Sequence, residues 1–258
     1  MLKIDNVAVL GTGVMGAQIA AHCANAGLKV FAFDIKQEIA ESGIEKATSI
    51  KPKAFYDKKD VSLIQCCNYD DHLEKLKVCD WIIEVIAERL DWKKDIYIKI
   101  APYVDNKIVT SNTSGISLAE LTEDMDDKLK KSFFITHFFN PPRYMKLVEF
   151  ISSDRNDQEL IDGMAHFMKD ILGKGVVYAK DTPNFIANRI GVFGMMITIN
   201  EAIKRKINIE DVDGLTGPII GRPKSATFRT ADIVGLDVMQ FVADTAYNKC
   251  ENDKYREQ

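Results

Sequence analysis

The sequence has no uninterrupted apolar run of membrane-spanning length, because charged residues break its longest apolar stretches. We therefore expect a soluble chain without membrane insertion. Only four histidines are present, and they form neither an H-x-x-x-H nor an H-E-x-x-H pair, so we expect no metal site. Internal repeats and low-complexity segments are also missing, which favours an ordinary globular protein.

Neither sign of charge is in large excess, since 34 Lys and Arg residues stand against 38 Asp and Glu residues, a net charge of -4. This near balance gives no reason to expect a nucleic-acid partner. The five cysteines are odd in number and show no C-x-x-C spacing, so we expect reduced thiols in a cytoplasmic protein. A glycine motif that begins at residue 11 also predicts that no signal peptide precedes it.

The most informative motif is the G-x-G-x-x-G fingerprint of residues 11–16, which lies between an apolar strand at residues 7–10 and an apolar helix. Gly11 allows a tight strand-to-helix turn, Gly13 lets the backbone approach a pyrophosphate, and Gly16 lets the helix pack on the sheet. The exposed N-terminus of the helix then receives the anion. The alternative is a surface glycine loop. The predicted cofactor contacts are Gly11, Gly13, Val14, Met15 and Gly16.

Asp34 ends the next apolar strand, at about the spacing where a carboxylate binds the adenosine ribose hydroxyls of a dinucleotide. A carboxylate at this place would repel the additional phosphate of NADP. The residue therefore favours NAD as the cofactor.

The first 180 or so residues alternate short apolar runs with amphipathic segments, which is typical of βα units on a parallel sheet. Pro183 disfavours helical geometry at the residue before it, and the pattern stays helical from Phe185 onward. We predict an α/β protein with a Rossmann-type, doubly wound, mostly parallel sheet over residues 1–182, and a smaller all-α domain over 183–258. Strands are expected at residues 7–10, 29–34, 81–86, 107–111, 133–137, 147–151 and 176–179.

The helix expected from Phe185 to Ile203 is apolar on several sides, so other helices should cover it. About 75 residues make a thin helical domain. The cover could therefore come from further sequence or from a second copy of the chain. Asp237 is expected to cap the last helix.

His137 ends an expected strand, and Glu149 lies twelve residues later on the strand that returns after Pro141 and Pro142. Whether the two strands are parallel or antiparallel, this return could bring the carboxylate beside the imidazole. Such a pair is a general base with its orienting group, which the oxidation of an alcohol by hydride transfer requires. The alternative is a histidine bound to a backbone carbonyl and a solvated glutamate.

The polar segment of residues 111–115 follows another expected strand and offers hydroxyl and amide groups. Ligands bind at this carboxyl edge of a doubly wound sheet. The alternative is a polar turn that caps the helix beginning near Ser117.

Taken together, these motifs resemble the L-3-hydroxyacyl-CoA dehydrogenase family over almost the whole chain. The resemblance rests on five motifs in the right order: residues 11–16, 84–88, 111–114, 137–141 and 180–189. It implies NAD-linked oxidation of L-3-hydroxyacyl-CoA to 3-ketoacyl-CoA in fatty-acid β-oxidation. It also implies a homodimer that pairs through the helical domain.

The resemblance also implies the roles of individual residues. His137 would be the general base and Glu149 its partner, while Ser114 and Asn188 would bind the substrate oxygens. Asn188 would reach across from the helical domain, so the active site should lie in the cleft between domains; a buried helical asparagine is the alternative. The positions implied to contact the cofactor are Asp34, Glu88, Lys93, Asn112, Ser114 and Asn140.

The sequence departs from the family pattern in two places. The segment between Asp34 and the strand at residue 81 is short for the family, and it retains lysines that could bind CoA phosphates or form a solvated face: Lys51, Lys53, Lys58 and Lys59. Residues 221–229 resemble the branch in which this module begins a longer multifunctional chain, so we expect a fragment.

The alternative functions for the sequence are another β-hydroxyacid dehydrogenase, a sugar-nucleotide dehydrogenase, or a silent NAD-binding module.

Overall fold

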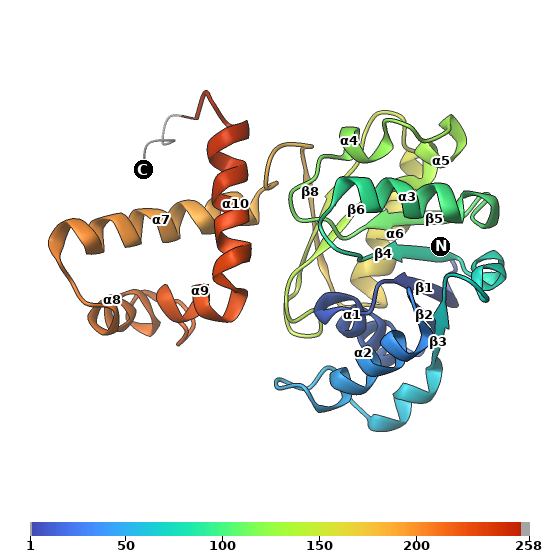
Figure 1. The fold of residues 1–258 in the computed structure, drawn as a ribbon, viewed down its shortest axis with the longest axis horizontal. Helices are drawn as coiled ribbons and strands as arrows, with labels where there is room; N and C mark the ends of the chain where they lie inside the picture. The colour runs from blue at the N-terminus through green and yellow to red at the C-terminus, as the bar shows by residue number, and fades with distance from the viewer. Residues whose placement is uncertain (1, 254–258) are drawn as a thin grey trace. The chain divides into compact units, whose positions relative to one another are not determined.

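Figure 1 shows the chain in a computed structural model, which describes residues 2–253. The chain divides into two compact units, Met1–Asp181 and Thr182–Gln258. The first unit contains the sheet, and the second unit, as far as residue 253, contains only helices among its regular elements, which confirms the predicted fold class. No helix within residues 2–253 is long and apolar enough to cross a bilayer.

The first unit is built on an eight-stranded sheet of order β3-β2-β1-β4-β5-β6-β7-β8. Neighbouring strands are parallel except β6 and β7, which run antiparallel. Strand order reverses at β1, which is the switch point where doubly wound sheets bind ligands. The strands are β1 (Asn6–Leu10), β2 (Lys29–Asp34), β3 (Ile64–Asn68), β4 (Trp81–Glu84), β5 (Ile108–Ser111), β6 (Phe133–Phe138), β7 (Leu147–Ile151) and β8 (Gly175–Ala179).

Helices cover both faces of this sheet, with α3 in front of it and α6 behind it in Figure 1. The main apolar core lies on one face, where Val9 and Ile83 pack with side chains of α1 and α6. Alternate strand residues point to the opposite face, which α3 covers through Tyr97. The helices are α1 (Val14–Asn25), α2 (Gln37–Ser49), α3 (Leu90–Ile100), α4 (Leu118–Thr122), α5 (Asp127–Ser132) and α6 (Gln158–Asp170).

Local sequence explains most element ends. Gly27 and Gly173 adopt positive φ values of 82° and 65° just after α1 and α6, as expected of residues that end helices. Ser117 and Glu120 form the predicted capping box at the start of α4. Strand β3 was not predicted, because it is a short edge strand, half exposed, whose residues follow no clear alternation.

The second unit contains α7 (Ala187–Arg205), α8 (Ile209–Thr216), α9 (Phe228–Val234) and α10 (Leu236–Lys249). Asp213 of α8 accepts hydrogen bonds from the backbone of Thr227, Phe228 and Arg229 and so caps α9. The prediction for Asp237 was wrong: the helix begins at Leu236, two residues earlier than a cap at Asp237 requires, and its N-cap residue is Gly235, which has no side chain to cap it. Gly235 has a φ of 100°, which glycine adopts readily, so the turn there needs no capping side chain.

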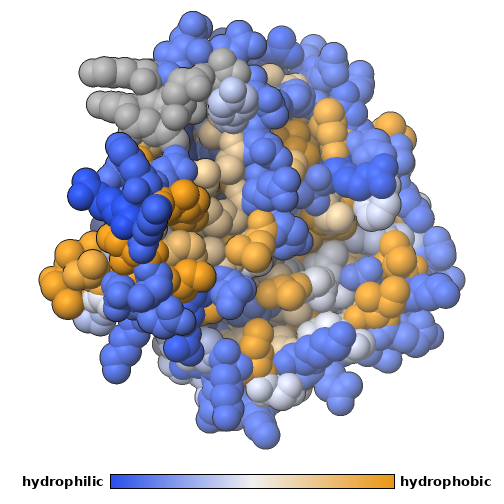
Figure 2. Space-filling view, turned by 60° about the vertical axis from the view of Figure 1, so that its left-hand side comes forward, coloured by the Kyte–Doolittle hydropathy of each residue, from blue (hydrophilic) through white to orange (hydrophobic). Residues whose placement is uncertain are grey.

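The described helices leave much of the apolar surface of α7 uncovered. Ile190 is 66% exposed and Ile203 is 72% exposed. Figure 2 shows such apolar side chains, in orange, among hydrophilic ones on the face turned toward the viewer. The described residues leave this surface open, and the expectation that further sequence or a second copy covers it stays a prediction.

His22 of α1 generates a testable pH dependence. Its Nε2 donates to the carbonyl oxygen of Leu172 at 3.1 Å, and within residues 2–253 its Nδ1 has no hydrogen-bond partner. Burial, with the nearby positive charge of Lys174, lowers the pKa of His22 from 6.5 to about 4. The unfolded chain therefore binds a proton between these values that the folded chain does not bind.

We expect the free energy of unfolding of the first unit to fall as the pH drops from about 7 to about 4.5. The contribution of His22 to this fall is about 2 kcal/mol. A His22→Gln variant keeps an N–H donor and does not titrate, so its loss should be smaller by that amount. Urea unfolding followed by the fluorescence of Trp81 and Trp92 measures the difference. Equal pH dependence in the two proteins would contradict the assignment.

Candidate active site

The glycine loop between β1 and α1 is shaped by close backbone contacts. Gly11 has a φ of 99°, and a Cβ there would lie 2.8 Å from the carbonyl oxygen of Val85. A Cβ on Gly16 would overlap the carbonyl oxygen of Gly11. Gly13 differs, because a Cβ there would meet no atom within 4 Å. Two glycines are therefore needed for packing, while the third borders open space that a ligand can enter.

A cavity of about 570 Å³ lies beside this loop and is lined by Gly13, Val14, Asp34 and one face of α2. Asp34 accepts hydrogen bonds from the backbone N–H and the hydroxyl of Thr12, at 2.8 and 2.6 Å. Helix α1 begins at the loop without a side-chain cap. An uncapped helix N-terminus, an open glycine and a fixed carboxylate in one cavity fit a dinucleotide.

The antiparallel pairing of β6 and β7 sets His137 directly opposite Glu149. Nδ1 of His137 lies 2.7 Å from Oε2 of Glu149, and the residues are 5% and 0% exposed. The strand register resolves the question left open by the sequence in favour of a His–Glu pair. A buried carboxylate favours the tautomer with the proton on Nδ1, which leaves the imidazole lone pair on Nε2.

Two asparagines connect the strand ends around this pair. Asn112 follows β5, and its Oδ1 accepts a hydrogen bond from the backbone N–H of Phe138 at 2.8 Å. Asn140 follows β6, and its Oδ1 lies 3.3 Å from Nε2 of Gln18 on α1. The structure therefore links the His137 strand to both β5 and the first helix. Gln18, which sequence reasoning missed, also lines the cavity beside the glycine loop.

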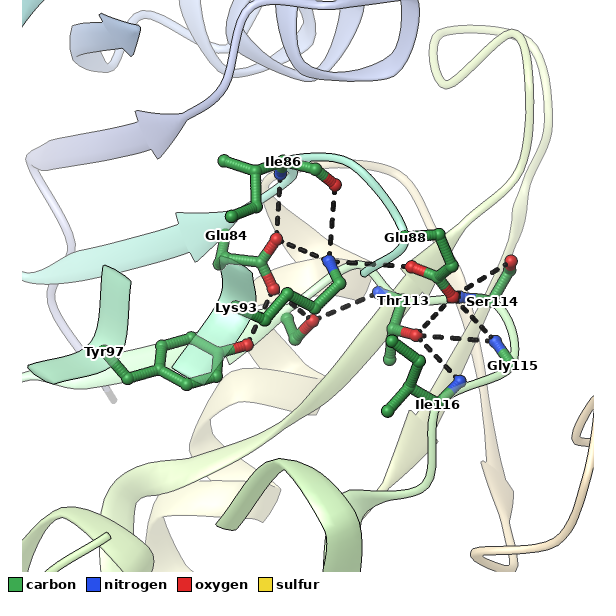
Figure 3. A network of polar contacts seen from close by, with 10 residues as sticks. Glu84, Ile86, Glu88, Lys93, Tyr97, Thr113, Ser114, Gly115 and Ile116 are labelled. Carbon is green, nitrogen blue, oxygen red and sulfur yellow. Dashed lines mark hydrogen bonds and ion pairs between the residues drawn. The ribbon is translucent and has the colours of Figure 1, made fainter. Parts of the chain in front are cut away.

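Glu88 organises the turn that follows β5 (Figure 3). Its Oε1 accepts hydrogen bonds from the Thr113 hydroxyl at 2.5 Å and from the backbone N–H groups of Ser114 and Gly115 at 2.8 and 3.0 Å. The Ser114 hydroxyl lies 3.4 Å from the same oxygen. The sequence-predicted residues Glu88 and Ser114 are therefore in contact, at the carboxyl edge of the sheet.

Lys93 is buried beneath this turn, with its side chain only 1% exposed. Its Nζ lies 2.6 Å from Oε1 of Glu84 and 3.5 Å from Oε2 of Glu88 (Figure 3). Lys93 is therefore linked to the Thr113–Gly115 turn through Glu88, and its expected contact with the cofactor stays a prediction. Sequence reasoning missed Glu84 as a functional candidate; the available indication was an ionisable residue at the end of an otherwise apolar strand.

The four candidate CoA-binding lysines, at positions 51, 53, 58 and 59, are exposed, so both of their interpretations stay open. Beside them, Arg143 lies 3.6 Å from the Tyr56 ring centroid and donates a hydrogen bond to the carbonyl oxygen of Lys53. Sequence reasoning missed this arginine. Asn188 lies near the start of α7 in the second unit, and its role stays a prediction.

Two family models match this chain. Residues 6–182 match the NAD binding domain of 3-hydroxyacyl-CoA dehydrogenase, and residues 185–258 match the C-terminal domain of the same family. Together the two matches cover nearly all of the sequence.

Individual relatives agree with these matches. A Bacillus subtilis protein named "Probable 3-hydroxyacyl-CoA dehydrogenase" is 44% identical over 97% of this chain, which spans 35% of that protein. A Deinococcus radiodurans protein of the same name is 43% identical over 94% of this chain and 72% of its own length. The crystal structure of (S)-3-hydroxybutyryl-CoA dehydrogenase from Ralstonia eutropha is 28% identical, with a TM-score of 0.85, over 98% of this chain and 90% of that one.

Gly43 of α2 gives a prediction about the cavity wall. A Cβ at this position would overlap the carbonyl oxygen of Thr12, the residue that holds Asp34. We expect Gly43→Ala to lower the free energy of unfolding by about 1–3 kcal/mol, because the backbone of α2 or of the glycine loop must shift to make room for the methyl group. The Tm should fall by roughly 2–4 °C for each kcal/mol.

Gly163→Ala in α6 is the matched control, because among residues 2–253 its new Cβ would meet only the Leu2 side chain, with Leu2 Cβ at 3.3 Å. Its Tm should change by no more than about 2 °C, since Leu2 at the edge of the chain needs to shift by only a few tenths of an ångström and alanine favours the helix. Thermal unfolding followed by tryptophan fluorescence measures both variants. Equal Tm values for the two variants would contradict the close approach of α2 to the glycine loop.

Proposed function

We propose, from the premise that the chain belongs to the 3-hydroxyacyl-CoA dehydrogenase family, that it oxidises the hydroxyl group of L-3-hydroxyacyl-CoA to a ketone. The observation that carries the proposal is the buried His137–Glu149 pair, 2.7 Å apart. NAD⁺, when bound, accepts the hydride that leaves the hydroxyl-bearing carbon. The proposed setting is fatty-acid β-oxidation.

His137 removes the hydroxyl proton in this proposal. Its Nε2 takes the proton from the hydroxyl oxygen while the hydride leaves the carbon that bears this oxygen, so a C=O bond forms and the imidazole becomes an imidazolium. Glu149 stabilises that positive charge and keeps the ring in one orientation, because its carboxylate is buried against Nδ1. In the reverse direction the imidazolium returns the proton to the ketone oxygen.

Ser114 and Asn188 hold the substrate oxygens in this proposal. Ser114 suits the role because Glu88 fixes its backbone at the carboxyl edge of the sheet. Asn188 would act from the helical domain. We propose that this domain spans residues 183–258 and that the cofactor domain spans residues 1–182. Their hydroxyl and amide groups would orient the alcohol toward His137.

NAD is the cofactor that the first unit fits, and we propose contacts from the glycine loop, Asp34 and the turn around Glu88. Asp34 favours NAD because its carboxylate would repel the additional phosphate of NADP. The lysines at positions 51, 53, 58 and 59 would bind the CoA phosphates as point charges. We also propose a cytoplasmic location, which the five free thiols support.

His137→Gln should lower kcat/KM for 3-hydroxybutyryl-CoA by at least about a hundredfold, because general-base catalysis is lost. NADH binding, measured by fluorescence, should stay within about twofold of the wild type, since the variant leaves the glycine loop unchanged. Steady-state NADH formation measures the first effect. A wild-type kcat/KM in this variant would remove the base assignment.

Glu149→Gln should also lower kcat/KM by about a hundredfold or more, because the imidazole loses the carboxylate that orients and stabilises it. The two residues act as one unit, so the double variant should cost little more than His137→Gln alone. Additive losses would show that Glu149 acts separately from His137.

NADH binding without turnover in the wild type would instead favour a silent NAD-binding module.

We further propose that two copies of the chain associate through the second unit, where apolar residues such as Ile190 and Ile203 are exposed. Light scattering at a concentration on the order of 10 µM should give the mass of a dimer. Charged substitutions at these two positions should shift that mass to a monomer. A monomeric wild type would contradict the proposal.

A further inference from the structure

Glu84 at the end of β4 is a buried carboxylate, with no exposed surface. Oε1 accepts hydrogen bonds from Lys93 Nζ at 2.6 Å and from the backbone of Ile86 at 2.8 Å. Oε2 accepts from the hydroxyls of Tyr97 and Ser111 at 2.7 and 2.6 Å. Both oxygens are therefore used. Well-packed apolar residues often replace such a pair without loss of stability, so stability alone is a weak reason for it.

Lys93 connects Glu84 to the turn after β5. The Lys93 ammonium lies between Glu84 and Oε2 of Glu88, and Oε1 of Glu88 accepts the hydrogen bonds of the Thr113–Gly115 turn (Figure 3). The chain of contacts thus runs from the core of β4 to the turn after β5. Two carboxylates and one ammonium leave a net charge of -1 in this network.

The network lies on the opposite side of β1 from Asp34. Strands β4 and β5 follow β1 in one direction of the sheet, while β2, which ends in Asp34, follows it in the other. A dinucleotide crosses a doubly wound sheet at this switch point, so its two halves lie over the two sides. Because Asp34 takes the adenosine half, the Glu88 turn faces the nicotinamide half.

We propose that Glu84 is a positioning residue for the nicotinamide half of the cofactor. It acts through Lys93, which it fixes beneath Glu88 so that Glu88 keeps the Thr113–Gly115 turn in its binding geometry. The inference rests on the proposed function in its use of NAD. It does not depend on which alcohol is oxidised.

The test compares two ligands, NADH and ADP-ribose, which lacks the nicotinamide ring. In Glu84→Gln, the Lys93 ammonium loses its nearest negative charge and turns toward Glu88, which loosens the turn. NADH should bind about tenfold more weakly, while ADP-ribose should stay within about twofold of the wild type. NADH fluorescence and calorimetry with ADP-ribose measure the two dissociation constants. Equal weakening of both ligands, or of neither, would overturn the proposal.

Tyr97→Phe is the matched control, because it removes one hydrogen bond from the same carboxylate and leaves the contact with Lys93. It should lower the Tm and leave the ratio of the NADH to the ADP-ribose dissociation constant within about twofold of the wild type. A tenfold change in this ratio would show that any disturbance of the Glu84 site has the same effect. That result would also overturn the positioning role.

The double variant Glu84→Gln/Lys93→Met keeps the test decisive if the single variant does not fold. It removes both charges, so it leaves no unpaired ammonium in the core and should be more stable than Glu84→Gln. The ratio of dissociation constants should remain about tenfold above the wild type, because Glu88 has lost its support. A wild-type ratio would make the pair purely structural. Wild-type NADH binding without oxidation of 3-hydroxybutyryl-CoA would contradict the proposed function alone.

Discussion

The antiparallel register of β6 and β7 is the constraint on which the candidate active site depends. Phe134, Phe138, Val148 and Phe150 of these strands lie in the main apolar core, so they fix the register by burial. His137 and Glu149 occupy the alternate positions and therefore meet on the other face of the sheet. A slip of one residue would move each side chain to the opposite face. Core packing on one face thus holds the His137–Glu149 pair on the other.

The ionisable groups of the site gather on one face of the sheet for the same reason. Trp81 and Ile83 of β4 point into the main core, so Glu84 points to the face covered by α3. Glu84 of β4 pairs in register with Ser111 of β5. The register of β5 with β6 then places His137 on the same face of the sheet. The apolar face under α1 and α6 provides stability, while the face under α3 holds the buried Glu84–Lys93 ion pair. Such charges are tolerated because each one is hydrogen-bonded or paired.

Residues near one another in the sequence were the easier ones to assign. The glycine fingerprint and the Ser117 capping box depend on local geometry, and both form as expected. Gly43 and Glu84 could not be assigned in this way. Gly43 matters only because α2 crosses the glycine loop, and Glu84 matters only because Lys93 and Ser111 converge on it. Asp237 is a local assignment that failed. It is a residue type that often caps helices, but it lies within the first turn of α10 and not before it.

The sequence by itself determined the cofactor cradle, because glycine conformation, helix start and an acidic residue at the end of a strand are encoded within about 25 consecutive residues. It also determined the alternation of strands and helices, through the spacing of apolar residues. Only the tertiary structure decided which polar groups meet. Strand register and burial are set by contacts between distant segments, and these place Glu149 on His137 and Lys93 between two carboxylates.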